Sequence, residues 1–150
     1  MRENNLKKEL TGLINAELGD LARLVKELKE CKGDTQIIRR AKGSILHDFY
    51  NACERLFELI AREVNGGLPS SGLWHKKLLY QMTLLIKGVR PAVISKKLAA
   101  ELDEFLAFRH LFRNIYGFEL EGGRLDELAA KLEKTAKLFI KEILAFVKKL

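Results

Sequence analysis

The sequence has few of the residues that interrupt helices or cross-link chains, with only two prolines and two cysteines in 150 residues. Leu, Lys, Glu and Ala are abundant instead, and together with the scarcity of proline they predict an all-helical protein. Two cysteines are too few for a disulfide framework or a zinc cluster, which excludes the small folds that depend on either. Cys31 and Cys53 are predicted to be reduced thiols, with Cys53 in the core.

Long uncharged apolar segments are also lacking. No such run approaches the roughly 18 residues that a membrane-spanning helix needs. The start of the chain, MRENNLKKEL, has no apolar segment of the kind found in secretory signals. We therefore expect a cytoplasmic protein that has no membrane contact. No motif for a metal ion or an organic cofactor stands out either, and none is expected.

The residues that are present suit a globular protein. Hydrophobic residues make up 47% and charged residues 31% of the chain, unlike a disordered tail. A chain of 150 residues buries about two-thirds of the surface that its unfolded form exposes, so we expect one domain over residues 1–150. The net charge of +7 favours RNA or an acidic partner; solubility alone is the alternative explanation.

Two long helices are predicted in the first part of the chain. Apolar residues spaced by three or four form a helical stripe over residues 3–31: Leu10, Ile14, Leu18, Leu21, Val25 and Leu28. Lys32-Gly33 ends this helix, and Asp34 is expected to cap the next one, which runs to about Val64. Two such helices joined by a tight turn form a hairpin, which is half of a four-helix bundle.

Three further helices follow a break at residues 65–72, NGGLPSSG, which is dense in turn-forming residues. The predicted ranges are about 72–87, 96–116 and 125–149. The Arg90-Pro91 step separates the first two, Ser95 is a candidate cap, and residues 117–124 are expected to form a turn. The pattern predicts an all-α protein: an antiparallel up-and-down bundle of four to five helices.

One stretch, FRHLFRNIYGFEL from Phe108 to Leu120, gathers charged and polar side chains in an otherwise apolar segment. They are Arg109, His110, Arg113, Asn114 and Tyr116. At about 100° per residue, Arg109 and Tyr116 fall on the apolar side of the helix, with Arg113 roughly 40° from Arg109. An inward-facing charge must be paired or serve a ligand. The stretch is therefore either a functional site or one side of a salt bridge to Glu54 or Asp48.

The segment FRHLFRNIY resembles the motif of the HEPN superfamily (higher eukaryotes and prokaryotes nucleotide-binding), and in particular of its HepT-like ribonuclease toxins. In that motif an arginine and a polar residue are followed, after three intervening residues, by histidine, any residue and tyrosine. Arg109 matches the arginine, His110 the polar position and Tyr116 the tyrosine. The run WHKKLLYQM at 74–82 and the Arg90-Pro91 step are also similar to that branch. The resemblance implies a HEPN-like helical bundle and metal-independent RNA cleavage, in which a ribose 2′-hydroxyl attacks the adjacent phosphate.

The chain departs from this motif where Asn114 stands in place of the family's histidine. Histidine exchanges protons near neutral pH and asparagine cannot. The predicted catalytic residues are Arg109, His110 and Asn114, of which His110 moves protons and Asn114 orients by hydrogen bonding. Arg113 and His75 are predicted to bind RNA phosphates. The alternatives for the two histidines are structural: an interface hydrogen bond for His110 and a cap for His75.

The resemblance also implies partners. In the resembled family two subunits bring their motif helices together, and minimal nucleotidyltransferase antitoxins accompany the toxins, some of them transferring AMP onto the motif tyrosine. Tyr116 is thus either such an acceptor or a core tyrosine. His47, in mid-helix beside core positions, is expected to have no function. The predicted function is a homodimeric HepT-like toxin that cleaves RNA. The alternative, motivated by Asn114, is a HEPN-fold protein whose nuclease activity has lapsed and that binds a nucleotide or a nucleotidyltransferase.

Overall fold

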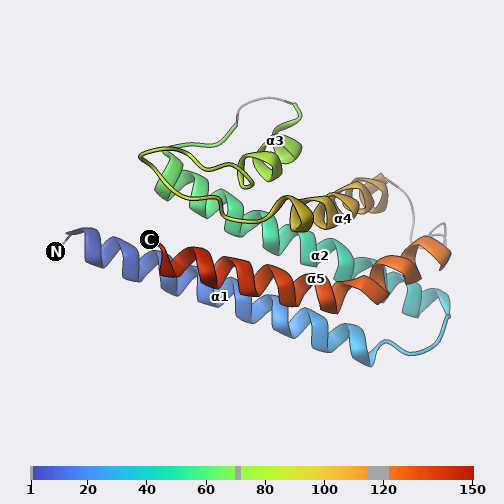
Figure 1. Cartoon of the computed structure of the whole chain (residues 1–150). Helices are drawn as coiled ribbons and strands as arrows, with labels where there is room; N and C mark the ends of the chain where they lie inside the picture. The colour runs from blue at the N-terminus through green and yellow to red at the C-terminus, as the bar shows by residue number, and fades with distance from the viewer. Residues whose placement is uncertain (1, 70–71, 115–121) are drawn as a thin grey trace.

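The computed structural model describes residues 2–69, 72–114 and 122–150. These residues form five α-helices and one π-helical turn, η1, that continues α2 (Figure 1). The elements are α1 (Arg2–Glu30), α2 (Gln36–Ile60), η1 (Ala61–Asn65), α3 (Trp74–Gln81), α4 (Lys96–Asn114) and α5 (Gly122–Lys148). The prediction of an all-α, antiparallel up-and-down bundle is confirmed.

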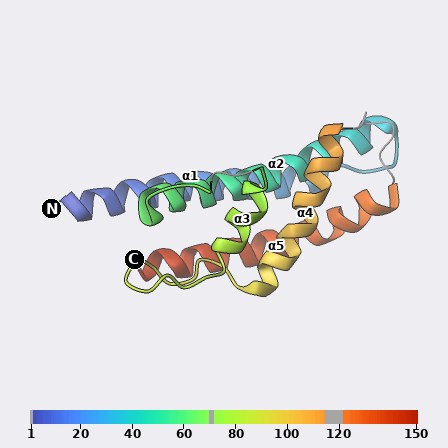
Figure 2. The ribbon, with the colours of Figure 1, turned by 90° about the horizontal axis from the view of Figure 1, so that it is seen from above.

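The central element is α2, which contacts each of the other four α-helices. α1 and α2 run antiparallel, as do α4 and α5 (Figure 1). Seen from above, α4 crosses α2 and α5 at a steep angle, with α3 beside its start (Figure 2). The two ends of the chain lie at the same end of the molecule, where Lys7 Nζ donates a hydrogen bond to the Leu150 carbonyl at 2.6 Å. Because α2 contacts both α3 and α4, its polar side chains on that side lie next to residues of both helices.

The helices form because their apolar residues recur at helical spacing and bury one side of each helix. In α1 the predicted stripe is buried from Leu10 to Leu21 and half-buried at Val25 and Leu28. Aromatic edge contacts join α2 to its neighbours: Phe49 meets Phe105 of α4 with ring centroids 5.0 Å apart. Each fully buried side chain of this size contributes about 1.5–3 kcal/mol to folding.

The caps of the helices agree with the sequence in one case and differ in another. Ser95 precedes α4 and its Oγ accepts a hydrogen bond from the Leu98 N–H at 3.1 Å, as predicted. The predicted cap of α2, Asp34, is wrong: Thr35 is the cap, with Oγ1 accepting from the Ile38 N–H at 3.2 Å. Asp34 instead receives two hydrogen bonds of 2.8 Å from Arg39, which hold the pKa of its carboxyl below the usual value.

The predicted third helix is too long, since α3 ends at Gln81 and not near residue 87. The reason is Arg90, which is buried and whose guanidinium donates to the carbonyl oxygens of Gln81 at 3.0 Å and of Leu84 at 2.7 Å. Its Nε donates to Asn65 Oδ1 at 2.7 Å. One side chain thus supplies donors to the end of α3 and ties it to η1, so the chain turns instead of continuing the helix.

The last helix, α5, begins at Gly122 and not near residue 125. The last three residues of the turn predicted at 117–124 are therefore helical. The first turn of a helix makes few intrahelical hydrogen bonds, and glycine costs little there. The rest of the predicted turn, residues 117–121, and the last two residues of the predicted fourth helix, 115–116, lie outside the described residues. No helix in the described part of the chain is long and apolar enough to cross a membrane.

Candidate functional site

Arg109 is positioned by the apolar side of α4, which packs against α2. Leu102, Phe105 and Phe108 are buried on this side, and the half-buried Arg109 continues it. Its Nε donates a hydrogen bond of 2.6 Å to Asn51 Oδ1 on α2. The observed partner of Arg109 is therefore the amide of Asn51. The two carboxylates suggested by the sequence, Asp48 and Glu54, each lie three positions from Asn51 on α2. An amide is neutral, so it orients the guanidinium without neutralising its positive charge as a carboxylate would.

Asn51 also lies next to His47, one turn earlier on α2. The Asn51 Nδ2 and His47 Nδ1 atoms are 3.3 Å apart. The His47 ring packs against Phe112 of α4 with centroids 5.3 Å apart, and Phe112 stacks on Phe108 at 6.0 Å. We expected no function for His47, but the structure places it in a short polar chain that ends at Arg109.

A second polar pair lies one turn further along α2. Glu54 is buried, and its Oε1 is 2.8 Å from Nδ1 of His75, in the first turn of α3. The Trp74 ring lies against the His75 ring with centroids 3.8 Å apart. His75 is thus held by a carboxylate and an indole, while 28% of its side chain stays exposed.

Tyr50 lies between the two pairs and is fully buried. In the part of the chain that the structure describes, neither its hydroxyl nor Glu54 Oε2 has a hydrogen-bond partner. Burial raises the pKa of the Tyr50 phenol well above its usual range, and the nearby Glu54 carboxylate raises it further, whereas the Arg109 charge lowers it. Buried polar groups without partners are rare in folded proteins. Tyr50 and Glu54 are one turn apart on α2, so both unpartnered groups belong to the same face of the helix.

The other predicted site residues cluster at the end of α4. His110 is exposed on that helix. Arg113 and Asn114 belong to its last turn, and their side chains lie outside what the structure describes. Tyr116 lies outside the described residues as well. The backbone of α4 therefore places Arg113 one turn beyond Arg109. The roles of Arg113, Asn114 and Tyr116 stay predictions.

From the sequence, Glu54 was considered only as an ion-pair partner, His47 was expected to have no function, and Tyr50 and Asn51 were not predicted to lie at the site. These four residues of α2 occur at positions 47, 50, 51 and 54, a helical spacing that puts them on one face of the helix. This recurrence of polar residues between buried apolar ones was the available signal. The pattern does not by itself indicate a site, because only the fold brings α2 and α4 together.

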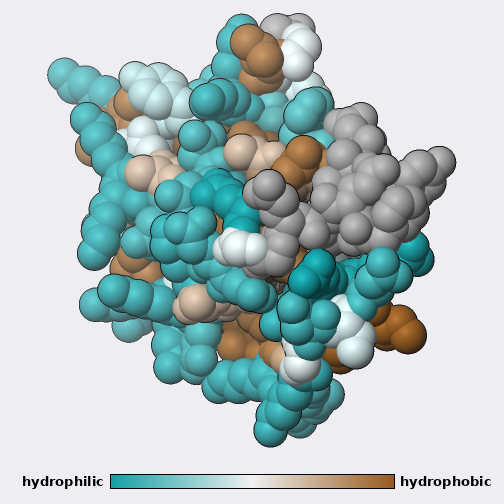
Figure 3. Space-filling view, turned by 90° about the vertical axis from the view of Figure 1, so that its right-hand side faces the viewer, coloured by the Kyte–Doolittle hydropathy of each residue, from teal (hydrophilic) through white to brown (hydrophobic). Residues whose placement is uncertain are grey.

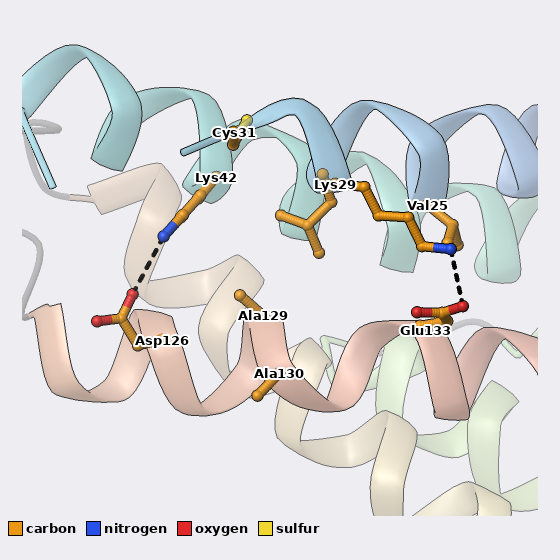
Figure 4. Close-up of a pocket in the computed structure, with 9 residues that line it drawn as sticks. Val25, Lys29, Cys31, Lys42, Asp126, Ala129, Ala130 and Glu133 are labelled. Atoms are coloured by element: carbon orange, nitrogen blue, oxygen red, sulfur yellow. Dashed lines mark hydrogen bonds and ion pairs between the residues drawn. The ribbon is translucent and has the colours of Figure 1, made fainter. Parts of the chain in front are cut away.

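A groove of about 550 Å³ lies elsewhere, between α5 and the α1–α2 hairpin (Figure 4). Two ion pairs cross it, Lys42 with Asp126 at 3.4 Å and Lys29 with Glu133 at 2.9 Å. Its lysines are thereby paired within the chain, and its described walls include no residue of α3 or α4. The described residues also hold no cluster of three or more His, Cys, Asp or Glu suited to a metal ion.

Comparison with known proteins gives one match. A protein-family model described as HepT-like protein matches residues 41–150. This range contains the whole of the site, from His47 to the end of α4. No curated protein and no solved structure matches the chain.

Proposed function

Because the chain belongs to the HepT-like protein family, we propose that it is the toxin component of a toxin–antitoxin system and cleaves RNA without a metal ion. The observation that carries this proposal is the setting of Arg109. Its guanidinium is fixed at 2.6 Å by the neutral amide of Asn51. A positive charge held in place by a neutral partner is what a phosphate undergoing attack requires.

The remaining roles follow from the motif on α4. Arg113, one turn beyond Arg109, adds a second positive charge for the phosphate. His110, exposed on the same helix, exchanges the proton of the attacking 2′-hydroxyl. Asn114 orients the RNA by hydrogen bonding, since an amide has both donors and an acceptor.

The surroundings of the site favour a polyanion. The chain carries a net charge of +7. Exposed lysines lie on α3, on the loop after it and at the start of α4: Lys76, Lys77, Lys87, Lys96 and Lys97. Of these, Lys76 and Lys77 directly follow His75 in the sequence. Outside the grey residues, the face of the molecule drawn in Figure 3 is mostly hydrophilic, with smaller hydrophobic patches among the polar side chains. Such a surface attracts an RNA backbone from a distance and does not select a sequence.

The proposed assembly is a homodimer in which two copies of α4 face each other, so that each RNA contacts both chains. The proposed partner is a minimal nucleotidyltransferase antitoxin, and Tyr116 is the proposed acceptor of AMP. Transfer of AMP would place a negative phosphate two or three residues from Asn114 and Arg113, where it repels RNA. Light scattering should give a mass twice that of the chain.

The direct test is RNA cleavage in the presence of a metal chelator. Wild type should cut RNA, and Arg109→Ala should be slower by about 100-fold to 1,000-fold, the usual effect of removing a group that stabilises developing charge. Arg55→Ala is the matched control, because Arg55 is an exposed arginine of α2 that pairs with Glu17. Equal rates for wild type and Arg109→Ala would contradict the proposal.

Asn114 favours a second candidate function, a binding protein whose nuclease activity has lapsed. It would hold a nucleotide or the nucleotidyltransferase partner at the same site. Under this alternative wild type is silent and Asn114→His gains metal-independent cleavage. A wild type that already cleaves RNA rejects the alternative.

A further inference from the structure

Cleavage of RNA by its own 2′-hydroxyl involves two proton transfers. One proton leaves the attacking hydroxyl, and another reaches the 5′-oxygen that departs from phosphorus. In the proposed function His110 accepts the proton of the attacking hydroxyl, and no residue yet donates the proton to the 5′-oxygen. The chain has three histidines, so His47 and His75 are the other candidates for that donor.

The ring nitrogens of His47 face the interior of the protein. Its Nδ1 faces the Asn51 amide at 3.3 Å. Its Nε2 is buried and has no hydrogen-bond partner in the described part of the chain. Neither ring nitrogen is therefore presented to a ligand.

His75 has the opposite geometry. Its Nδ1 is bound at 2.8 Å to the Oε1 atom of Glu54, whose side chain is only 6% exposed. The carboxylate fixes the ring and supplies the counter-charge for its protonated form. Trp74 lies against the ring and limits its rotation. With Nδ1 occupied, Nε2 is the nitrogen that can donate a proton, and the side chain is partly exposed at the surface.

The position of this pair suits the same phosphate as Arg109. Asn51 and Glu54 are three residues apart on α2, which is about 4.5 Å along the helix axis. Asn51 holds Arg109 and Glu54 holds His75. The two pairs are therefore held by neighbouring turns of the same helix, on the side of α2 that contacts α3 and α4.

We propose that His75, oriented by the buried Glu54, is the general acid of the RNA cleavage reaction. This inference rests on the proposed function. The 2′-oxygen forms a bond to phosphorus and gives its proton to His110. The bond from phosphorus to the 5′-oxygen breaks, its electron pair stays on that oxygen, and Nε2 of His75 supplies the proton. The products are a 2′,3′-cyclic phosphate and a 5′-hydroxyl, and His75 regains its proton from solvent.

The test compares two substrates of the same sequence, one normal and one with sulfur in place of the bridging 5′-oxygen. A thiolate leaves without protonation, so the sulfur substrate does not need a general acid. His75→Gln should lose about 100-fold to 10,000-fold of the wild-type rate on the oxygen substrate and stay within a few-fold of wild type on the sulfur substrate. Glu54→Gln should show a smaller loss, again on the oxygen substrate alone.

Two controls separate this role from a structural one. Arg109→Ala should be impaired on both substrates, because the phosphate charge is the same in each. Glu58→Gln, one turn beyond Glu54 and beside Arg62 at 4.0 Å, should match wild type on both.

Each outcome is decisive. His75→Gln that equals wild type on the oxygen substrate, or that loses equally on both substrates, overturns the role of His75 while RNA cleavage by the wild type stands. A wild type that cleaves neither substrate overturns the proposed function, and the assignment of His75 falls with it.

Discussion

The properties of the Arg109 side chain depend on its hydrogen-bond partner, Asn51. An aspartate at position 51 would neutralise the guanidinium, whereas the amide of Asn51 accepts its hydrogen bond and leaves the charge available. Asparagine and aspartate differ in a single functional group. That group decides whether Arg109 is neutralised by its partner or keeps its charge, as the proposed phosphate site requires.

Replacing Asn51 by aspartate should therefore weaken RNA binding. We expect Asn51→Asp to raise the Kd for RNA by at least about tenfold, or 1.4 kcal/mol, since the new carboxylate competes with phosphate for Arg109. Asn15→Asp, at an exposed position of α1, introduces the same charge and is the control. Binding is measured by fluorescence anisotropy. Equal losses in the two variants would mean that RNA does not contact Arg109.

A second prediction at this scale concerns alkaline pH. Burial raises the pKa of the Cys53 thiol well above its usual range. In the unfolded chain a thiol ionises from about pH 8.5 upward. Above that pH the unfolded state binds fewer protons than the native state, so the free energy of unfolding falls, by up to about 1.4 kcal/mol per pH unit. Below it, the thiol is protonated in both states and contributes no pH dependence.

Urea unfolding across this range measures the effect. Cys53→Ala should remove up to about 1.4 kcal/mol per pH unit from the alkaline slope, whatever its effect on stability at neutral pH. Slopes that agree between wild type and Cys53→Ala would show that the native thiol ionises as readily as the unfolded one.

At the scale of elements, Arg90 organises the connection between α3 and α4. Its guanidinium reaches Asn65 at the end of η1, the carbonyl oxygens of Gln81 and Leu84, and the carbonyl oxygen of Pro91 at 3.0 Å. Burial lowers the pKa of this side chain, and four hydrogen-bond acceptors offset the cost of removing its charge from water. Arg90 therefore determines where α3 ends and, through α3, where His75 stands.

Arg90→Met should destabilise the protein by about 2–3 kcal/mol, because it leaves buried carbonyl oxygens without donors. Arg124→Met is the control, since Arg124 is a partly exposed arginine of α5 that pairs with Glu127, and its loss should cost less than about 1 kcal/mol. Chemical denaturation measures both. A cost for Arg90→Met no larger than that of the control would show that solvent satisfies those carbonyl oxygens.

Helix α3 also shows what apolar spacing in the sequence can and cannot predict. Helix-period apolar residues predicted α1 and α2 almost to their ends, and Ser95 was identified as the cap of α4. The end of α3 was not predictable in this way. Leu84, Leu85 and Ile86 extend its apolar character, and only the buried guanidinium from a later position explains why the helix stops at Gln81.

At the scale of the whole molecule, the proposed binding of RNA by a chain with a net charge of +7 should weaken as salt is added, because each phosphate that a lysine or arginine neutralises releases counterions. The logarithm of the binding constant should fall linearly with the logarithm of the salt concentration, with a slope of about −0.7 for each phosphate neutralised on single-stranded RNA. Arg109→Ala should reduce that slope by about one phosphate contact, and Arg55→Ala should leave it unchanged. An unchanged slope for Arg109→Ala would place the phosphate contacts elsewhere on the surface.

The sequence by itself determined the helical class, the order of the helices and the segment of α4 that carries Arg109, His110 and Arg113. These depend on local spacing, because apolar periodicity, caps and turn-forming residues act over a few positions along the chain. The family resemblance depended on the same short spacings.

Only the tertiary structure decided which residues face that segment. Asn51 lies 58 positions from Arg109 and Glu54 lies 21 positions from His75, and neither pairing follows from any local pattern. They arise because α2 packs against both α3 and α4. This packing brings Asn51 within hydrogen-bond distance of Arg109, and the buried Glu54 within hydrogen-bond distance of His75.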